Sequence, residues 1–190
     1  ISGDVPESDI HLTRTDDSTK SNSDRYTLAN QKNGDVLVSI HLNGSTDHLF
    51  DGTLALYGKR NKDLAFAQAM YSAMRAHIPA PAGVVLRPLG VTNFASGVLL
   101  KSDMPAVLTE SVFVSNESEC DLLVNGMGER QQQIANALYQ GLIDWFSANP
   151  GDDPGDPGDD PSDPGDPGDD PKPPNPNKPP KCETPPCNVK

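Results

Sequence analysis

The chain has 190 residues and a formal net charge of −12, with 22% charged and 5% aromatic residues. An acidic chain argues against nucleic acid as a partner, because a phosphate-binding surface would be basic. No run approaches the roughly 18 apolar residues of a membrane span, so no membrane-spanning segment is expected. The composition of the chain does not indicate its oligomeric state.

Composition divides the chain near residue 147. From Pro150 onward the sequence is dominated by Pro, Gly and Asp and has almost no apolar side chains. Residues 148–190 contain nine Asp and one Glu against four Lys, a net charge of −6 and half of the total. Such a segment cannot bury enough surface to offset its ordering entropy. We therefore expect a single domain at residues 1–147 and a disordered acidic linker or tail at residues 148–190.

Two cysteines near the carboxyl end, Cys182 and Cys187, are separated by four residues. Either the pair is incidental or it forms a small disulfide loop in an exported protein. The two prolines between them could preshape the turn or could hold the thiols apart. Both interpretations stay open.

Hydrophobic periodicity predicts alternating strands and helices along the first 149 residues. Strands are expected at residues 10–14, 36–41, 53–57, 98–100 and 105–110. Helices are expected at residues 24–32, at 61–78, from 116 onward, and in a last stretch that Asn149-Pro150 ends. The alternation predicts an α/β domain with a mostly parallel, twisted sheet flanked by helices.

Two of the expected strands end in side chains that can do chemistry. The run Val-Leu-Val-Ser-Ile at residues 36–40 is nearly continuous in apolar character, as a strand covered on both faces requires, and it leads into His41. A second run, Pro-Ala-Val-Leu-Thr at residues 105–109, leads into Glu110. If the two strands are parallel, both side chains open onto the same edge of the sheet. A neutral imidazole and a carboxylate on one rim are the parts of a metal-assisted hydrolase.

Each of these residues also has a structural interpretation. A histidine at a strand end, such as His41, is often simply hydrogen-bonded. Glu110 is the stronger candidate, because a carboxylate among apolar neighbours is costly to bury unless it is paired or functional. No Gly-x-Ser-x-Gly elbow and no glycine-rich phosphate loop occurs. The remaining histidines are weaker candidates by position: His11, His48 and His77.

Four blocks together resemble the zinc-dependent N-acetylmuramoyl-L-alanine amidases, over roughly residues 8–147. The blocks are Leu12-Thr-Arg14, Arg25 with Ala29-Asn30, residues 35–43 (DVLVSIHLN) and residues 105–116 (PAVLTESVFVSN). The resemblance implies that His41 is a ligand of a Zn²⁺ cofactor and that Glu110 is the catalytic carboxylate. It implies peptidoglycan as the substrate, cleaved at the amide between N-acetylmuramic acid and L-alanine. It also implies a bacterial or phage-encoded protein that acts in the cell envelope or outside the cell, whereas it indicates no substrate-binding residues.

The chain departs from this family at its beginning. Family members hold zinc with a further histidine on a first strand and a glutamate on a first helix, both upstream of the Leu-Thr-Arg block. Only eleven residues precede Leu12, and a catalytic zinc needs about three protein ligands. We therefore interpret the chain as a fragment of an amidase that lacks this first strand and helix. The alternatives are a non-catalytic wall-binding or regulatory relative that has lost its zinc site, and an unrelated α/β domain tethered by an acidic linker.

Overall fold

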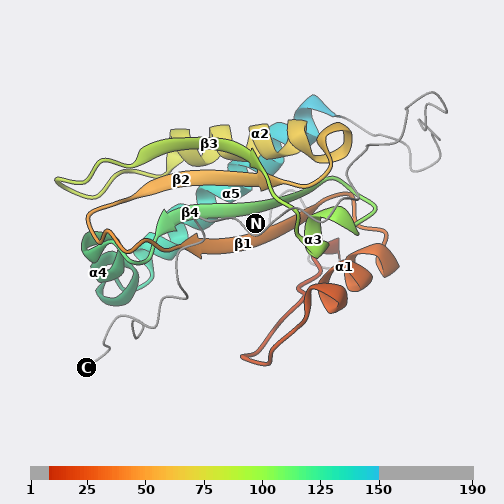
Figure 1. The fold of residues 1–190 in the computed structure, drawn as a ribbon, viewed down its shortest axis with the longest axis horizontal. Coiled ribbons are helices and arrows are strands. Elements are labelled where there is room, and N and C mark those ends of the chain that lie inside the picture. Colours follow the sequence, from red (N-terminus) through yellow and green to blue (C-terminus); the bar gives the residue numbers. More distant parts are fainter. Residues whose placement is uncertain (1–8, 150–190) are drawn as a thin grey trace.

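The computed structural model describes residues 9–149, which form one sheet with helices on both faces (Figure 1). The strands are β1 (Leu37–Asn43), β2 (Gly52–Tyr57), β3 (Arg87–Asn93) and β4 (Ala106–Phe113). The helices are α1 (Asn22–Gln31), α2 (Arg60–His77), α3 (Gly97–Leu100), α4 (Glu117–Asn125) and α5 (Glu129–Ala148). Within residues 9–149, no helix has the length and apolar character needed to cross a bilayer. The predicted tail begins at residue 148, and only its first two residues are described. The rest of the tail, including the Cys182–Cys187 pair, lies outside the described residues.

The four strands lie in the order β1-β4-β2-β3. The pairs β1–β4 and β2–β3 are parallel, whereas β2–β4 is antiparallel. The sheet is therefore mixed, with two of its three pairings parallel as expected. The antiparallel pairing arises because the loop after β1 turns the chain back, so that β2 runs against both β1 and β4.

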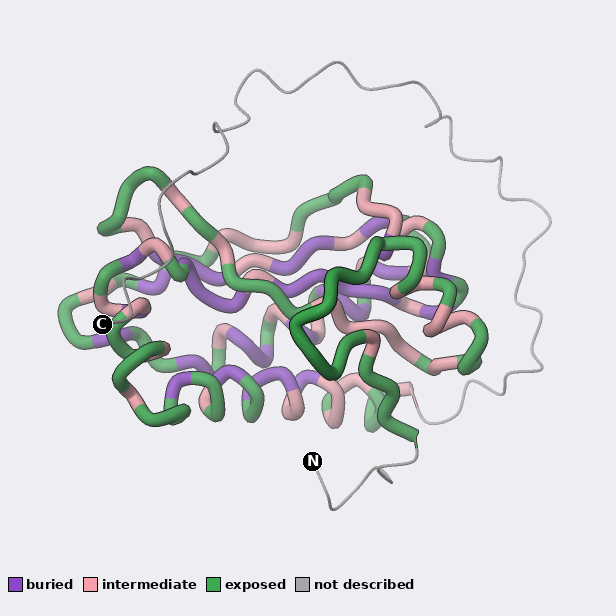
Figure 2. The backbone as a smooth tube through the Cα atoms, turned by 90° about the horizontal axis from the view of Figure 1, so that it is seen from below, coloured by how far each residue is buried: buried purple, intermediate pink, exposed green. Residues whose placement is uncertain are grey.

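The main core lies between the sheet and the two long helices α2 and α5 (Figure 1). On α2, Phe66 and Met70 are fully buried, and the Phe66 ring lies 5.1 Å from the ring of Trp145 on α5. Ile134 and Leu138 bury the same face of α5, as its periodicity predicts. Figure 2 shows the buried residues along the sheet and along the helix sides that face it.

The opposite face of the sheet carries a smaller apolar cluster beneath α3. Leu99 of α3 packs there with Leu56 of β2 and with Ala106 and Leu108 of β4. Because side chains alternate along a strand, these residues point away from the main core. Glu110 is two residues beyond Leu108 and continues the face that carries this cluster.

Buried carboxylates fix β4 near both of its ends. Asp63 on α2 accepts a hydrogen bond from the backbone N–H of Ala106 at 3.0 Å, and Asp51 accepts one from Phe113 at 2.9 Å. Both aspartates are fully buried. Hydrogen bonds from N–H groups to buried carboxylates are charge-assisted and strong, so they hold the strand that carries Glu110 in a defined register.

Three expectations about individual segments were wrong. Residues 10–14 form no strand and are largely exposed, because no neighbouring strand pairs with them in the described chain. The segment 98–100, predicted as a strand, belongs to the short helix α3. Strand β3 was not predicted from the sequence, because Pro88 and Gly90 interrupt its apolar pattern.

Strand β1 is not covered on both faces as its apolar run suggested. It is an edge strand of the described sheet and pairs with β4 alone. Ile40 is 62% exposed and Leu42 is 39% exposed. The reason is positional: α2 packs against β2, β3 and β4, whereas β1 makes its main contacts with β4, so the outer part of β1 is left exposed in residues 9–149.

Candidate active site

The sheet places His41 directly beside Glu110. The two residues are register partners in the parallel pair β1–β4, immediately before the register shifts between His41 and Asn43. Residues in register on neighbouring strands project from the same face of a sheet. The two strands are parallel and bring these side chains to one face of the sheet, but Glu110 does not end its strand as predicted, because β4 continues to Phe113.

The Glu110 carboxyl group is partly withdrawn from water. Its Oε2 atom is buried and accepts no hydrogen bond within the described residues. On the neighbouring antiparallel strand its register partner is Leu54, an apolar side chain that packs on the α3 cluster. Burial raises the pKa of Glu110 from 4.5 to about 7, since removal from water penalises the charged form. The carboxyl group can therefore both accept and donate a proton near neutral pH.

The His41 imidazole is held by its own strand. Its Nε2 atom lies 3.0 Å from the hydroxyl oxygen of Ser39, which is two residues earlier and on the same face. Although the residue as a whole is exposed, partial burial of the ring lowers the pKa of His41, and the positive charge of Arg25 lowers it further. The neutral ring that results is the form in which histidine binds metal ions.

The described residues do not complete a metal centre. No group of three His, Cys, Asp or Glu side chains within residues 9–149 converges on a point that could hold an ion. His41 is the candidate ligand beside Glu110. The other histidines are not on the sheet: His11 and His48 are exposed outside the strands, and His77 is the last residue of α2.

Two residues that act on His41, Ser39 and Arg25, were assigned no role from the sequence. Ser39 could have been found from its spacing, because residues two apart on a strand share a face. Arg25 could not, since its effect on His41 depends on how α1 packs against α3 rather than on strand periodicity.

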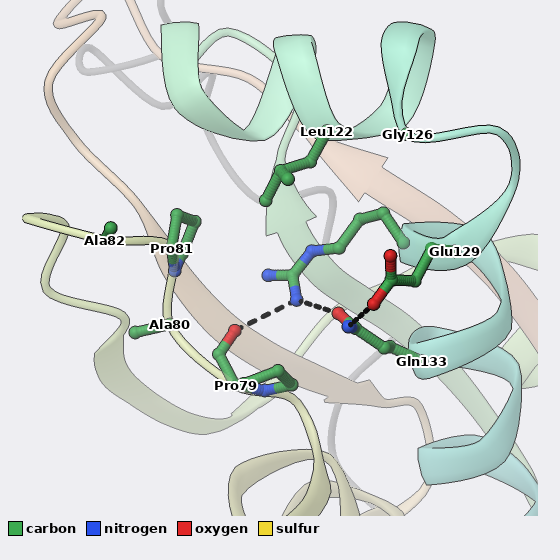
Figure 3. A pocket seen from close by; sticks show the side chains of 9 residues that line it. Pro79, Ala80, Pro81, Ala82, Leu122, Gly126, Glu129 and Gln133 are labelled. Atoms are coloured by element: carbon green, nitrogen blue, oxygen red, sulfur yellow. Dashed lines mark hydrogen bonds between the residues drawn. The ribbon is translucent and has the colours of Figure 1, made fainter.

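The molecule also has a groove away from His41 and Glu110, and the charged residue that lines it is held by contacts within the fold. It has a volume of about 190 Å³ and lies between residues 79–82, α4 and the first turns of α5 (Figure 3). Arg130 lines it but forms a buried ion pair with Glu119, donates to the carbonyl of Pro79 at 2.9 Å and to Gln133 at 2.8 Å. The guanidinium therefore joins α4, α5 and the 79–82 segment, and neither His41 nor Glu110 lines the groove.

Comparison with known proteins identifies relatives of this arrangement. The model of the N-acetylmuramoyl-L-alanine amidase family matches residues 5–144. The germination-specific N-acetylmuramoyl-L-alanine amidase of Bacillus subtilis is 27% identical over 131 residues, which cover 68% of this chain and 52% of that protein. The probable cell wall amidase LytH of Staphylococcus epidermidis is 30% identical over 132 residues, with 68% and 42% covered. The chain thus spans about half the length of the curated relatives it matches.

Solved structures agree with the sequence relatives. An N-acetylmuramoyl-L-alanine amidase from Clostridium difficile 630 superposes with a TM-score of 0.61 at 32% identity, covering 71% of this chain and 70% of that one. The catalytic domain of CwlV, an N-acetylmuramoyl-L-alanine amidase from Bacillus (Paenibacillus) polymyxa var. colistinus, has the same TM-score of 0.61 at 27% identity, with 72% of each chain covered.

Proposed function

We propose that this chain, which belongs to the N-acetylmuramoyl-L-alanine amidase family, is part of a peptidoglycan hydrolase that cleaves the amide between N-acetylmuramic acid and L-alanine. The observation that carries the proposal is the register pairing of His41 with a desolvated Glu110 on one face of the sheet. Amide hydrolysis needs a group that takes a proton from water and returns it to the leaving amine. Glu110 has the pKa for both steps.

In the proposed mechanism Glu110 is the general base and then the general acid. Its carboxylate accepts a proton from the water that attacks the amide carbonyl. The same carboxyl group then donates the proton to the nitrogen of the departing L-alanine, so that the C–N bond breaks without releasing a free amide anion. The apolar neighbours of Glu110 support both steps, because they keep its pKa near neutrality.

Zinc is proposed as the cofactor of the complete enzyme, with His41 as one ligand. The described residues do not make up a whole zinc centre, since residues 9–149 bring no three candidate ligands together and a catalytic zinc takes about three. The missing ligands would have to come from outside the described residues. No step of the proposed mechanism above is assigned to the metal.

A second candidate function is a non-catalytic wall-binding or regulatory protein built on the same sheet. The incomplete ligand set favours it, because a family member without its metal would keep the fold and lose the reaction. The two candidates share peptidoglycan as the partner. For both we propose action in the cell envelope or outside the cell, supported by relatives described as cell wall amidases.

The test is the release of new amino termini from purified peptidoglycan supplied with zinc. It is made with this chain and with a longer form that includes any in-frame coding sequence upstream of Ile1. In a form that cleaves, Glu110→Gln should abolish cleavage with zinc content unchanged, whereas His41→Ala should lower both. Cleavage by Glu110→Gln at the wild-type rate would show that Glu110 is not the general base. Binding of peptidoglycan without cleavage by either form would favour the second candidate.

A further inference from the structure

The cysteine on helix α4 is covalently engaged. Cys120 lies in the first turns of α4 at a half-buried position, and its sulfur is part of a disulfide. Residues 9–149 contain no second cysteine, and the structure contains one chain. The other two cysteines of the chain are Cys182 and Cys187, which lie outside the described residues. Cysteine arithmetic therefore leaves these two as the possible partners of Cys120.

A bond to Cys120 competes with a small loop between Cys182 and Cys187, because each sulfur forms one disulfide. Sequence distance alone favours the small loop, since Cys120 is more than sixty residues from either tail cysteine and a longer loop costs more entropy to close. Against the small loop, the two prolines between Cys182 and Cys187 can hold these thiols apart. A bond to Cys120 therefore requires that the folded domain favours the approach of the tail to α4.

The tail is long enough to return to α4. Helix α5 begins beside α4, where Arg130 pairs with Glu119, and its 20 residues make it about 30 Å long. The chain therefore leaves α5 about 30 Å from α4. Residues 150–181 lie between that point and Cys182. A random coil of this length spans about 30 Å on average, and an extended chain about 100 Å. Because an encounter is most frequent when the mean span of a linker matches the distance, this length suits the approach to Cys120.

Charge also favours the approach of the tail. The exposed Glu117 and Asp121, on either side of Cys120 in α4, line a hollow against residues 81–82, and Glu129 lines the adjoining groove (Figure 3). The segment directly before Cys182, residues 171–181 (PKPPNPNKPPK), carries three lysines and no acid. The nine Asp of the tail all lie earlier, within residues 150–170. The acidic surface beside Cys120 therefore attracts the part of the tail that leads into the two cysteines and repels the part that precedes it.

We propose that a disulfide from Cys120 to Cys182 or Cys187 fastens the carboxyl-terminal segment of this chain to α4. Two thiols give up two protons and two electrons as the S–S bond forms. A disulfide of the surroundings, such as glutathione disulfide or an oxidised thiol oxidoreductase, takes them up and is reduced to two thiols. Such oxidants are available outside the cytoplasm, which agrees with the proposed location in the cell envelope or outside the cell. The link lays the lysine-rich segment 171–181 along the acidic side of α4.

The experiment maps the disulfide in the 190-residue chain. The native protein is equilibrated with reduced and oxidised glutathione, its remaining thiols are alkylated, and it is digested without reduction by trypsin and a glutamate-specific protease. Cleavage after Glu119 and Glu183 places each cysteine on a different peptide, so mass spectrometry distinguishes every pairing. The peptide that begins at Cys120 should be joined to a tail peptide. Cys182→Ser and Cys187→Ser then identify the partner, because one of them should abolish the link and the other should keep it.

The same oxidation in concentrated urea is the control for the fold. Without the folded domain the near pair should dominate, so the ratio of Cys120-linked product to Cys182–Cys187 loop should fall about tenfold or more. An alkylated Cys120 with a Cys182–Cys187 loop in the native protein, a Cys120–Cys120 bond between two chains, or the same ratio in urea would each overturn the proposal. The link buries almost no apolar surface, so the experiment measures the bond itself rather than the unfolding midpoint. None of these readouts involves peptidoglycan cleavage, so either result leaves the amidase proposal standing.

Discussion

The Glu110 carboxyl group shows how the neighbours of one residue change its pKa. Leu54 stands beside it on β2, Leu108 precedes it on the same face, and one of its oxygens is buried without a hydrogen bond in the described structure. These contacts raise its pKa from 4.5 to about 7. The same contacts make the charged form of Glu110 a source of instability in the fold.

The pH dependence of stability follows from that pKa. A carboxyl group whose pKa is raised on folding contributes stability below its unfolded pKa of 4.5 and loses it as the pH rises through about 7. Glu110→Gln removes the titration, so its free energy of unfolding should rise relative to the wild type between pH 4.5 and pH 7. The gain should be about 1–2 kcal/mol after screening of this half-exposed group by solvent.

Denaturant unfolding of both proteins below and above this pH range measures the effect. The exposed Glu117 provides a control, because its change to Gln removes no desolvated charge. A constant difference in stability between wild type and Glu110→Gln across the range would mean that Glu110 is well solvated.

At the scale of elements, the two long helices pack closely at Gly141. A Cβ atom added there would lie 3.1 Å from the Cβ of Ala73 and 3.2 Å from the Cα of Met70 on α2. Contacts this short require the helix backbones to separate. The close approach of α2 and α5 therefore depends on the missing side chain.

Gly141→Ala should lower the free energy of unfolding by about 1–3 kcal/mol. On an exposed helix position the same change would stabilise by about 1 kcal/mol, because alanine is the better helix former. Ala135→Gly, on the exposed side of α5, is the reverse control and should cost about 1 kcal/mol. Thermal or urea unfolding measures all three proteins, and a more stable Gly141→Ala would show that the helices can move apart without loss.

The elements that the sequence predicted are those with strong local patterns. The runs that lead into His41 and Glu110 were correctly predicted as strands because they are nearly continuous in apolar character. Helix α5 was correctly predicted because its apolar residues recur at the helical period. Strand β3 was not predicted, because Pro88 and Gly90 are tolerated at the other edge of the sheet. The antiparallel pairing of β2 with β4 depends on which strand inserts beside which, and no local pattern encodes that choice.

The candidate site was predictable to the same extent. The pairing of His41 with Glu110 followed from two strands assumed to be parallel. The role of Leu54 in desolvating Glu110 could not be predicted from the sequence, because it requires β2 to lie beside β4. Nor could the effect of Arg25 on His41, because it depends on how α1 packs against α3.

At the scale of the whole molecule, the chain has two parts of different composition: a folded domain and an acidic segment that follows it. The folded core lies within residues 9–149, and half of the net charge of −12 lies in residues 148–190. The chain covers about 70% of the solved relatives, and β1 is left at the edge with Ile40 exposed. Within residues 9–149 the inner strands β2 and β4 are therefore well packed, whereas the carboxyl-terminal half of the edge strand β1 is exposed.

Removal of residues 150–190 should leave the thermal unfolding midpoint of the domain unchanged. The reason is compositional: this segment offers almost no apolar side chains with which to bury surface. Differential scanning calorimetry of the full and shortened chains, at equal ionic strength, measures it. A fall of several degrees would place the domain boundary beyond residue 147.

Titration with zinc tests whether the chain holds enough metal ligands to form a tight site. Because residues 9–149 bring no three candidate ligands together, we expect isothermal titration with zinc to show no tight one-to-one site. His41→Ala should then titrate in the same way as the wild type, since a single imidazole holds a metal weakly. A stoichiometric submicromolar site that His41→Ala abolishes would contradict this expectation. In that case His11→Ala and His48→Ala would identify which further histidine completes it, because each true ligand must weaken binding when it is removed.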